Sequence, residues 1–179
     1  MKNAKLILPC EEYLQSYFEL CKEYKDNNVK TMSFHDSDTF DEWKHTIFQT
    51  YENYRNGINL PSGYVPGTTF WLVEDGEVIG VGGIRHRLTE SLEKFGGHIG
   101  YGIKYSKWNK GYGTLQLKLL LEEAAKLGIR HALITCNDDN IGSARVIEKN
   151  GGKLQDIIDN VIDGVPRRTR RYWVDTPLA

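Results

Sequence analysis

The sequence has no apolar run of the roughly 20 residues that a membrane-spanning helix needs. Its first residues, MKNAKLILPCEEYLQ, reach charged side chains after a few apolar ones, unlike a secretion signal. An excess of one charge is also missing, because 23 basic and 24 acidic residues give a net charge of -1. Such a balance provides no broad field for nucleic acid or an anionic membrane. These absences predict a cytoplasmic protein that binds neither nucleic acid nor a membrane.

Cysteine is scarce as well, with only Cys10, Cys21 and Cys136 in the chain. An odd number of cysteines without metal-ligand spacing indicates reduced thiols rather than a disulfide framework. Cys136 ends an apolar run, which favours a buried packing role. The stretch HDSD at residues 35–38 lacks a second ligand cluster at a recognisable spacing, so no metal site is predicted.

The length of 179 residues and the hydrophobic share of 40% suit one domain over residues 1–179, since no repeat or low-complexity linker divides the chain. Asp75-Gly76 and Asp163-Gly164 each separate two runs rich in β-branched or aromatic residues, and so predict two hairpins. The remaining expected elements are a strand at 4–8, amphipathic helices at 10–24 and 38–57, a strand at 96–105, a helix at 115–128, a strand at 130–136 and a shorter helix at 140–151. This order predicts an α/β (α+β) fold whose mixed, mostly antiparallel central sheet is flanked by helices and contains one parallel strand pair.

The expected strand GGHIGYGIKY alternates between large and small side chains. Ile99, Tyr101 and Ile103 share one face, whereas His98 and Gly100 belong to the other. Glycine inside a strand often marks a close approach by a ligand or another backbone. A peptide-like ligand arm is therefore expected along this strand.

The sequence KWNKGYGT, residues 107–114, directly precedes a long helical run. Free N–H groups and the helix dipole make the start of a helix a good site for phosphate, and glycines leave room for it. The turn lacks the Gly-Lys-Ser/Thr of a Walker loop and the third glycine of the dinucleotide fingerprint. An ordinary strand-to-helix turn remains the alternative.

A ligand with a pyrophosphate and an amide-rich arm describes coenzyme A, and residues 95–152 resemble the GNAT acetyltransferase superfamily. IKYSKWNKGYGT is similar to that family's strand followed by Arg/Gln-x-x-Gly-x-Gly/Ala at a helix start. CNDDNIGSARVIEKNGG is similar to its strand-end Asn, short helix and closing Gly-Gly or Gly-Phe. The resemblance implies a GNAT-like fold with acetyl-CoA as co-substrate and no metal.

The same resemblance assigns residues to the coenzyme. Tyr101 and Ile103 would pair with the pantetheine arm, and Asn140 and Ser143 would contact it from the opposite side. An N-cap for Asn140 and a solvated helix position for Ser143 are the alternatives. The pyrophosphate would be held by the backbone of Asn109, Lys110, Gly111, Tyr112, Gly113 and Thr114.

The catalytic groups depart from the family pattern. His98 falls where many members carry a glutamate, and its ordinary pKa of about 6.5 makes it the favoured general base. A hydrogen-bonded pocket wall is the alternative for His98, with Glu90 and Glu93 as weaker base candidates. Ile147 replaces the usual tyrosine that protonates the sulfur, so that Tyr112, Tyr172 or water would have to act instead. Trp108 replaces the Arg or Gln that usually begins the phosphate turn.

Candidates for the acceptor site are few. Trp71, Glu90 and Tyr172 are predicted to contact the acceptor, although a core position is favoured for Trp71, as it is for Trp43 and Trp173. The basic run RRTRR at residues 167–171 suits a charged sheet edge better than a contact with an acidic acceptor.

These patterns predict an N-acetyltransferase that transfers acetyl from acetyl-CoA to a primary amine by direct attack in a ternary complex. The acceptor would be a small molecule or a protein N-terminus, and a homodimer stays open. A non-catalytic acyl-CoA-binding or sensing module is the alternative, since the usual glutamate and tyrosine are missing. An interaction domain without a coenzyme is the third reading.

Overall fold

The computed structural model describes residues 1, 3–29, 35–162 and 164–178. The strands are β1 (Lys5–Ile7), β2 (Gly67–Glu74), β3 (Glu77–Arg85), β4 (Ile99–Ile103), β5 (His131–Asn137), β6 (Lys153–Ile162) and β7 (Val165–Asp175). The helices are α1 (Leu14–Asp26), α2 (Phe40–Trp43), α3 (Ile47–Asn56), α4 (Glu90–Lys94), α5 (Tyr112–Lys126) and α6 (Ile141–Lys149). None of the helices in the described residues is both long and apolar enough to cross a bilayer.

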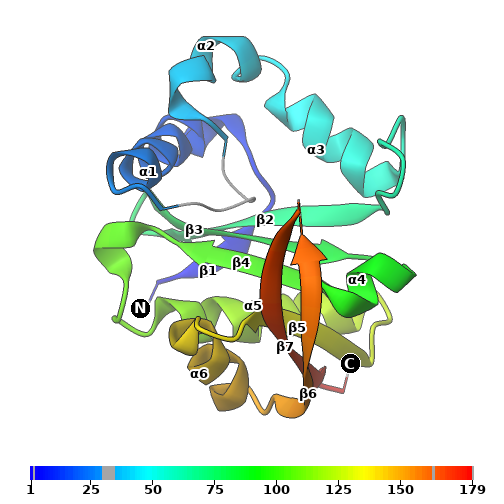
Figure 1. Cartoon of the computed structure of the whole chain (residues 1–179). Coiled ribbons are helices and arrows are strands. Elements are labelled where there is room, and N and C mark those ends of the chain that lie inside the picture. The colour runs from blue at the N-terminus through cyan, green and yellow to red at the C-terminus, as the bar shows by residue number, and fades with distance from the viewer. Residues whose placement is uncertain (2, 30–34, 163, 179) are drawn as a thin grey trace.

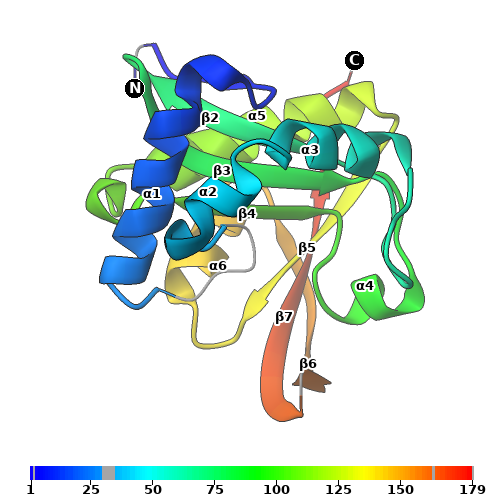
Figure 2. The ribbon, with the colours of Figure 1, turned by 90° about the horizontal axis from the view of Figure 1, so that it is seen from above.

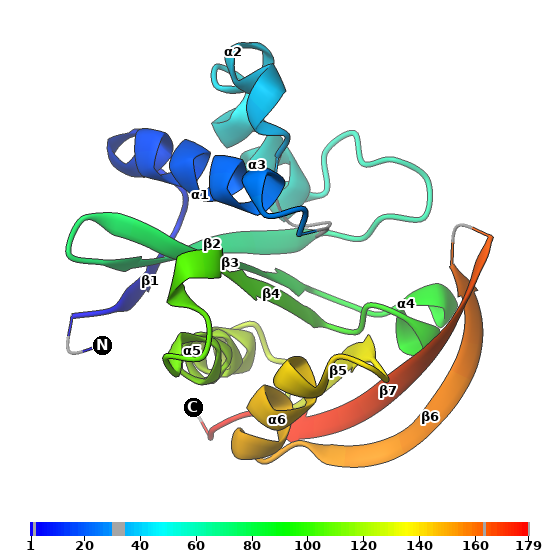
Figure 3. The same ribbon diagram turned by 60° about the vertical axis from the view of Figure 1, so that its left-hand side comes forward.

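Two antiparallel sheets carry the fold, with strand orders β1-β2-β3-β4 and β5-β7-β6. Helices α1 and α3 cover one face of the first sheet, while α5 and α6 lie on its other side (Figure 1; Figure 3). The β6–β7 hairpin is long, and its tip projects beyond the rest of the molecule (Figure 2). The predicted mixed α/β architecture with helices on both sides of the strands is thus confirmed.

The expected parallel strand pair takes a specific form. Strands β4 and β5 belong to different sheets, and one backbone hydrogen bond, from His98 N to Leu133 O at 2.7 Å, joins them. They leave this point in the same direction, because Tyr101, three residues beyond His98, packs against the core cluster that contains Cys136, three residues beyond Leu133. The pair therefore diverges at once instead of forming a ladder.

The helices follow the predicted apolar faces, with two differences. The expected helix at 38–57 is divided into α2 and α3, because the side chain and the backbone N–H of Thr46 both bond to Trp43 O and close a tight turn. Helix α4 lies outside the predicted elements; the Thr89 hydroxyl caps it by accepting from Leu92 N at 3.3 Å. Both predicted hairpins are present, although Asp163 in the second turn lies outside the described residues.

Helix α5 packs closely on the first sheet because two glycines of β3 make room for it. A Cβ on Gly80 would lie 3.0 Å from Gln116 Nε2 of α5, and one on Gly82 would lie 2.6 Å from Leu120 Cδ1 of the same helix. Leu117 and Leu120 are fully buried, and burial of such a side chain contributes roughly 1.5–3 kcal/mol. This packing holds the start of α5 beside the end of β4.

Candidate functional site

The turn before α5 has a backbone suited to an anion. Asn109 and Gly111 have positive φ values of 58° and 85°, whereas Lys110 between them does not. Alternation of this kind turns successive N–H groups toward one side and forms a concave anion site. Within the described part of the chain, the backbone N–H groups of residues 109–114 find no acceptor. The predicted pyrophosphate residues thus offer unpaired donors at the start of a helix.

The two glycines of this turn serve different purposes. Gly111 takes a left-handed conformation that side chains disfavour, as its φ of 85° shows. A Cβ on Gly113 would lie 3.2 Å from Val146 Cγ2, so Gly113 lets α6 approach α5. Each glycine thus also has a requirement within the chain, beside the predicted one of leaving space for phosphate.

Strand β4 presents an unpaired edge toward β5. Lys104 N donates to Ile79 O at 2.9 Å, which directs the backbone groups of even-numbered β4 residues toward β3. The N–H and C=O groups of Tyr101 and Ile103 therefore point to the open edge. Ile103 O accepts from Tyr24 and, at 2.7 Å, from Trp108 Nε1, which leaves the Tyr101 groups and Ile103 N for a ligand.

The opposite side of the opening is the edge of β5. Asp138 N donates to Arg168 O at 2.9 Å, so the even-numbered residues of β5 face β7. The backbone groups of Thr135 and Asn137 consequently point toward β4. The open edges of β4 and β5 thus face each other across a gap. The two edges are joined where His98 N bonds to Leu133 O, and they diverge from that point.

His98 is buried at the narrow end of this gap. Its Nδ1 accepts a hydrogen bond from the backbone N–H of Leu133 at 3.0 Å. Burial and then the positive charge of Arg85 lower the pKa of His98. In the neutral ring Nδ1 is therefore occupied and Nε2 carries the hydrogen, so neither nitrogen has a free lone pair. This geometry favours a structural role over the predicted role of general base.

A pair of hydroxyl groups lies beside the gap. Tyr101 OH and Ser143 Oγ are 3.0 Å apart, joining β4 to the first turn of α6. Asn140 Oδ1 accepts from Ser143 N at 3.0 Å, so Asn140 caps α6 as the alternative interpretation held. Ser143 is half-buried, and its contact with Tyr101 is the feature that sequence reasoning missed.

The proposed substitutes for the missing acid lie elsewhere. Tyr112 OH donates to Glu74, at the far end of β2. Tyr172 is fully buried, and its hydroxyl donates to Glu148 at 3.0 Å. Ile147, at the usual position of the acid, is a fully buried core residue. The Tyr101 and Ser143 hydroxyls, which pair with each other beside the gap, are the candidates that remain.

The predicted acceptor contacts do not form one surface. Trp71 is fully buried and stacks on Tyr17 with ring centroids 4.6 Å apart, so it is a core residue. Tyr172 is equally inaccessible. Glu90 is an exposed residue of α4, paired with Lys94 at 2.8 Å. The acceptor assignments of Trp71 and Tyr172 conflict with their burial, because a buried side chain cannot meet an acceptor.

An accessible floor lies on the face of β4 opposite α5. Gly83 and Gly100 are cross-strand partners. Among the described residues, no atom lies within 4 Å of the place that a Cβ on Gly100 would take, and the nearest atom for Gly83 is 3.7 Å away. Unlike Gly80 and Gly82, this pair therefore leaves space that the described chain does not fill.

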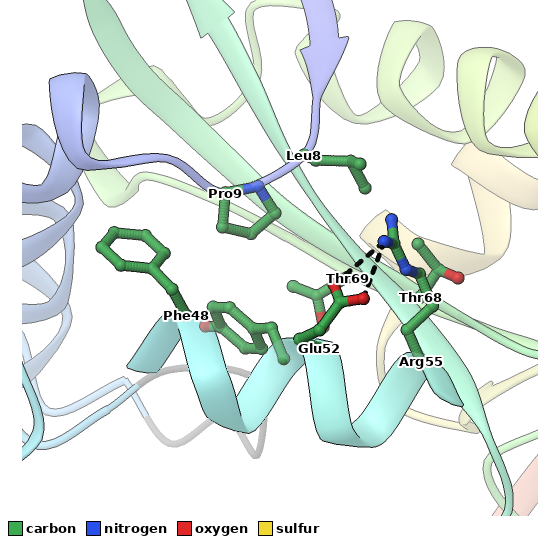
Figure 4. A pocket seen from close by; sticks show the side chains of 8 residues that line it. Leu8, Pro9, Phe48, Glu52, Arg55, Thr68 and Thr69 are labelled. Carbon is green, nitrogen blue, oxygen red and sulfur yellow. Dashed lines mark hydrogen bonds and ion pairs between the residues drawn. The ribbon is translucent and has the colours of Figure 1, made fainter. Parts of the chain in front are cut away.

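A separate pocket of about 170 Å³ lies between α3, the segment after β1, and β2 (Figure 4). Pro9 and Phe48 form its apolar side, and Thr69 forms part of its floor. Glu52 and Arg55 at its rim are paired with each other at 2.9 Å. Because Thr69 is two strands away from Gly100, this pocket is distinct from the gap between β4 and β5.

The HDSD stretch has a structural explanation. His35 Nδ1 is 2.6 Å from Tyr17 OH, while Asp36 accepts from Asp38 N at 3.0 Å and pairs with Lys25. Over the described residues, no group of three potential metal ligands gathers.

A family model described as an acetyltransferase (GNAT) domain matches residues 7–153. No curated protein sequence matches the chain at a significant level. The chain resembles a Salmonella typhimurium acetyltransferase that modifies the N-terminal serine of ribosomal protein L7/L12, with 20% identity, a TM-score of 0.70 and coverage of 99% of this chain and 97% of that one.

Two further solved structures show the same fold. Mycobacterium smegmatis RimJ in complex with CoA-disulfide has a TM-score of 0.73 and 15% identity, over 96% of this chain and 81% of that one. The Microcin C7 self-immunity acetyltransferase MccE in complex with acetyl-CoA and AMP has a TM-score of 0.70 and 16% identity, over 98% and 93%. The family model and the shared fold place this chain in the GNAT family, and it is an acetyl-CoA-dependent acetyltransferase.

Proposed function

We propose that the protein transfers the acetyl group of acetyl-CoA directly to a primary amine of a small molecule or a protein N-terminus. The observation that carries the proposal is the joint geometry of the α5 turn and β4. Unpaired N–H groups of residues 109–114 lie at one end. The open backbone edge of Tyr101 and Ile103 leads from them toward the gap. These two features suit a diphosphate and an amide-rich arm, respectively.

Bound acetyl-CoA supplies the acetyl group as a thioester. The residues of the α5 turn would hold its diphosphate, and Tyr101 and Ile103 would align its arm along β4. The Tyr101–Ser143 hydroxyl pair would donate a proton to the sulfur as the carbon–sulfur bond breaks. The outward N–H of Tyr101 or Ile103 would stabilise the negative charge on the carbonyl oxygen.

The acceptor would approach over Gly83 and Gly100, because α5 closes the other face. An amine with a pKa of about 10.4 is mostly protonated at pH 7. Since the His98 ring is already engaged, the amine would lose its proton to water on this open face. We therefore expect kcat/KM to rise with pH as the fraction of neutral amine grows.

The test is thiol release from acetyl-CoA, measured across a panel of small amines and peptides with free N-termini. Mass spectrometry of the products identifies the acetylated nitrogen. Saturable turnover with at least one amine supports the proposal. Tight coenzyme binding without turnover on any amine would instead indicate the acyl-CoA-sensing module.

A further inference from the structure

The junction between the two sheets is built from three consecutive residues, Gly96, Gly97 and His98. Gly97 has a φ of 59°, and a Cβ on it would lie 2.3 Å from Leu133 O, so only glycine fits there. Gly96 N donates to Thr135 Oγ1 at 2.9 Å, which ties the segment to β5. The segment thus makes closer contact with β5 than any other part of the β4 strand does.

Arg85 of β3 holds the same segment from the other side. Its Nη1 donates to Gly96 O at 3.0 Å and to Gly97 O at 3.1 Å. In addition, Arg85 N donates to His98 O at 2.8 Å. The junction is therefore hydrogen-bonded to both sheets, through Arg85 on one side and through β5 on the other.

His98 itself faces both sheets. In a regular strand the N–H and C=O of one residue point toward the same neighbouring strand. At His98 the C=O points to β3 and the N–H points to Leu133 of β5. In a regular ladder the Leu133 N–H would donate to a carbonyl oxygen of the neighbouring strand. Here it donates instead to Nδ1 of the His98 ring.

We propose that His98 is a positioning residue whose imidazole replaces a strand carbonyl, ends the pairing of β4 with β5, and so fixes where the coenzyme gap opens. The ring satisfies a buried N–H that would otherwise lack a partner. Without it, the bond from His98 N to Leu133 O is the one backbone–backbone link from the junction to β5 within the described residues, beside the Gly96 N–Thr135 Oγ1 bond, and the distance between the two open edges is less firmly set. This role deepens the proposed function and rests on it for its effect on coenzyme binding.

Three variants separate this role from that of a base. The amide oxygen in His98→Asn can take the place of Nδ1, whereas His98→Gln places its amide near Nε2, and His98→Ala removes the acceptor. Neither amide takes up a proton near neutrality. If His98 is a positioning residue, only His98→Asn therefore keeps its function. If His98 is a general base, all three variants lose it.

Hydrogen exchange of the Leu133 amide, calorimetry with coenzyme A and the pH dependence of kcat/KM are the measurements. We expect His98→Asn to keep wild-type Leu133 protection, coenzyme affinity and pH profile. His98→Ala and His98→Gln should lose roughly tenfold or more of the protection, as expected for a buried hydrogen bond, with KM for acetyl-CoA rising more than kcat falls.

The proposal is overturned if His98→Asn loses turnover as fully as His98→Ala while Leu133 protection stays unchanged in both. Failure of the proposed function is distinguishable from this result. If the wild-type protein binds no coenzyme A, the acetyltransferase reading fails, yet exchange at Leu133 in the three variants still decides whether His98 pins the strands.

Discussion

The hydroxyl of Tyr101 on β4 lies 3.0 Å from Oγ of Ser143 on α6, and this contact crosses one side of the gap between β4 and β5. Tyr101 is mostly buried, and burial holds the pKa of its hydroxyl well above the ordinary value. Its proton therefore stays in place at neutral pH. Ser143 shares that proton network at the site proposed for the departing sulfur.

Replacement of Ser143 by alanine tests this hydroxyl pair. We expect Ser143→Ala to lower kcat by about tenfold or more, because the proposed proton network beside the departing sulfur would lose one of its two hydroxyls. Coenzyme affinity, measured by calorimetry, should change little. Ser106→Ala is the matched control, since its hydroxyl pairs with Glu23 outside the gap. Equal kcat in Ser143→Ala and wild type would remove the hydroxyl pair from the mechanism.

The second prediction concerns the phosphate turn. Gly111→Ala forces a side chain into the left-handed region at φ 85°, which costs about 1–2 kcal/mol. It should lower both Tm and coenzyme affinity, because the turn relaxes and its N–H groups lose their alignment. Gly63→Ala is the control: Gly63 has a φ of 83° in a loop, and no atom of the described residues lies within 4 Å of its Cβ position.

Both variants should lose similar stability, and only Gly111→Ala should bind coenzyme A more weakly. If the two variants lose affinity equally, the turn has no specific role.

A third prediction follows from a buried glutamine. Gln116 is fully buried beneath β3, and neither atom of its amide finds a hydrogen-bond partner in the described part of the chain. Gln116→Met keeps the length and removes two unsatisfied polar groups, so it should stabilise the protein by about 1–3 kcal/mol. Urea unfolding measures the change. A loss of stability would show that the amide is satisfied in solution, as by a buried water.

Histidine burial gives a pH prediction. Burial lowers the pKa values of His35, His86 and His98, with Arg85 adding to the effect at His98. The unfolded chain then binds more protons than the fold as the pH drops below about 6.5. The free energy of unfolding should be greatest above that pH and should fall between pH 6.5 and 5, before the carboxylates titrate.

Urea unfolding across that pH window checks whether the free energy of unfolding falls on acidification. His98→Asn should lose less stability than wild type over this window, because one of the three histidine rings with a lowered pKa is gone. A stability that rises on acidification through the same window would contradict the neutral state of these rings, including the acceptor role of His98.

Thiol reactivity provides the last prediction. Burial raises the pKa of Cys136 to about 11 and that of Cys21 to about 11 as well. At pH 7 both are thiols, and thiols react slowly with alkylating agents. Cys10, which is half-buried, should be labelled first, and coenzyme A should slow labelling of Cys136 further. Preferential labelling of Cys136, read by mass spectrometry, would place that thiol in an open site.

Sequence patterns were sufficient for α1, α5 and the glycine turn before α5 because these depend on local chemistry. The apolar period of α5 and the glycine turn before it involve neighbouring residues, so Gly111 could be recognised directly. The role of His98 could not, because its partner Leu133 is distant in the chain and is met only when the second sheet folds against the first. The pair Gly96-Gly97 was the available signal, since adjacent glycines before a strand indicate a close backbone approach.

The predictions that Trp71 and Tyr172 contact the acceptor conflict with the structure because burial depends on residues that are distant in the chain. Alternation along β2 and β7 shows that Trp71 and Tyr172 share faces with apolar residues, but it does not tell a core from a pocket wall. Burial decides the matter, and both side chains are fully covered. By contrast, the cap made by Asn140 is local and follows from the residues after it.

Titration of the protein with coenzyme A by calorimetry, alongside its melting temperature, tests the central claim most directly. The account predicts saturable binding with one site per chain and a rise in Tm that increases with ligand concentration. Binding should weaken in Gly111→Ala and stay unchanged in Gly63→Ala. Absence of heat together with an unchanged Tm at high coenzyme concentration would contradict the seating of a diphosphate on the α5 turn.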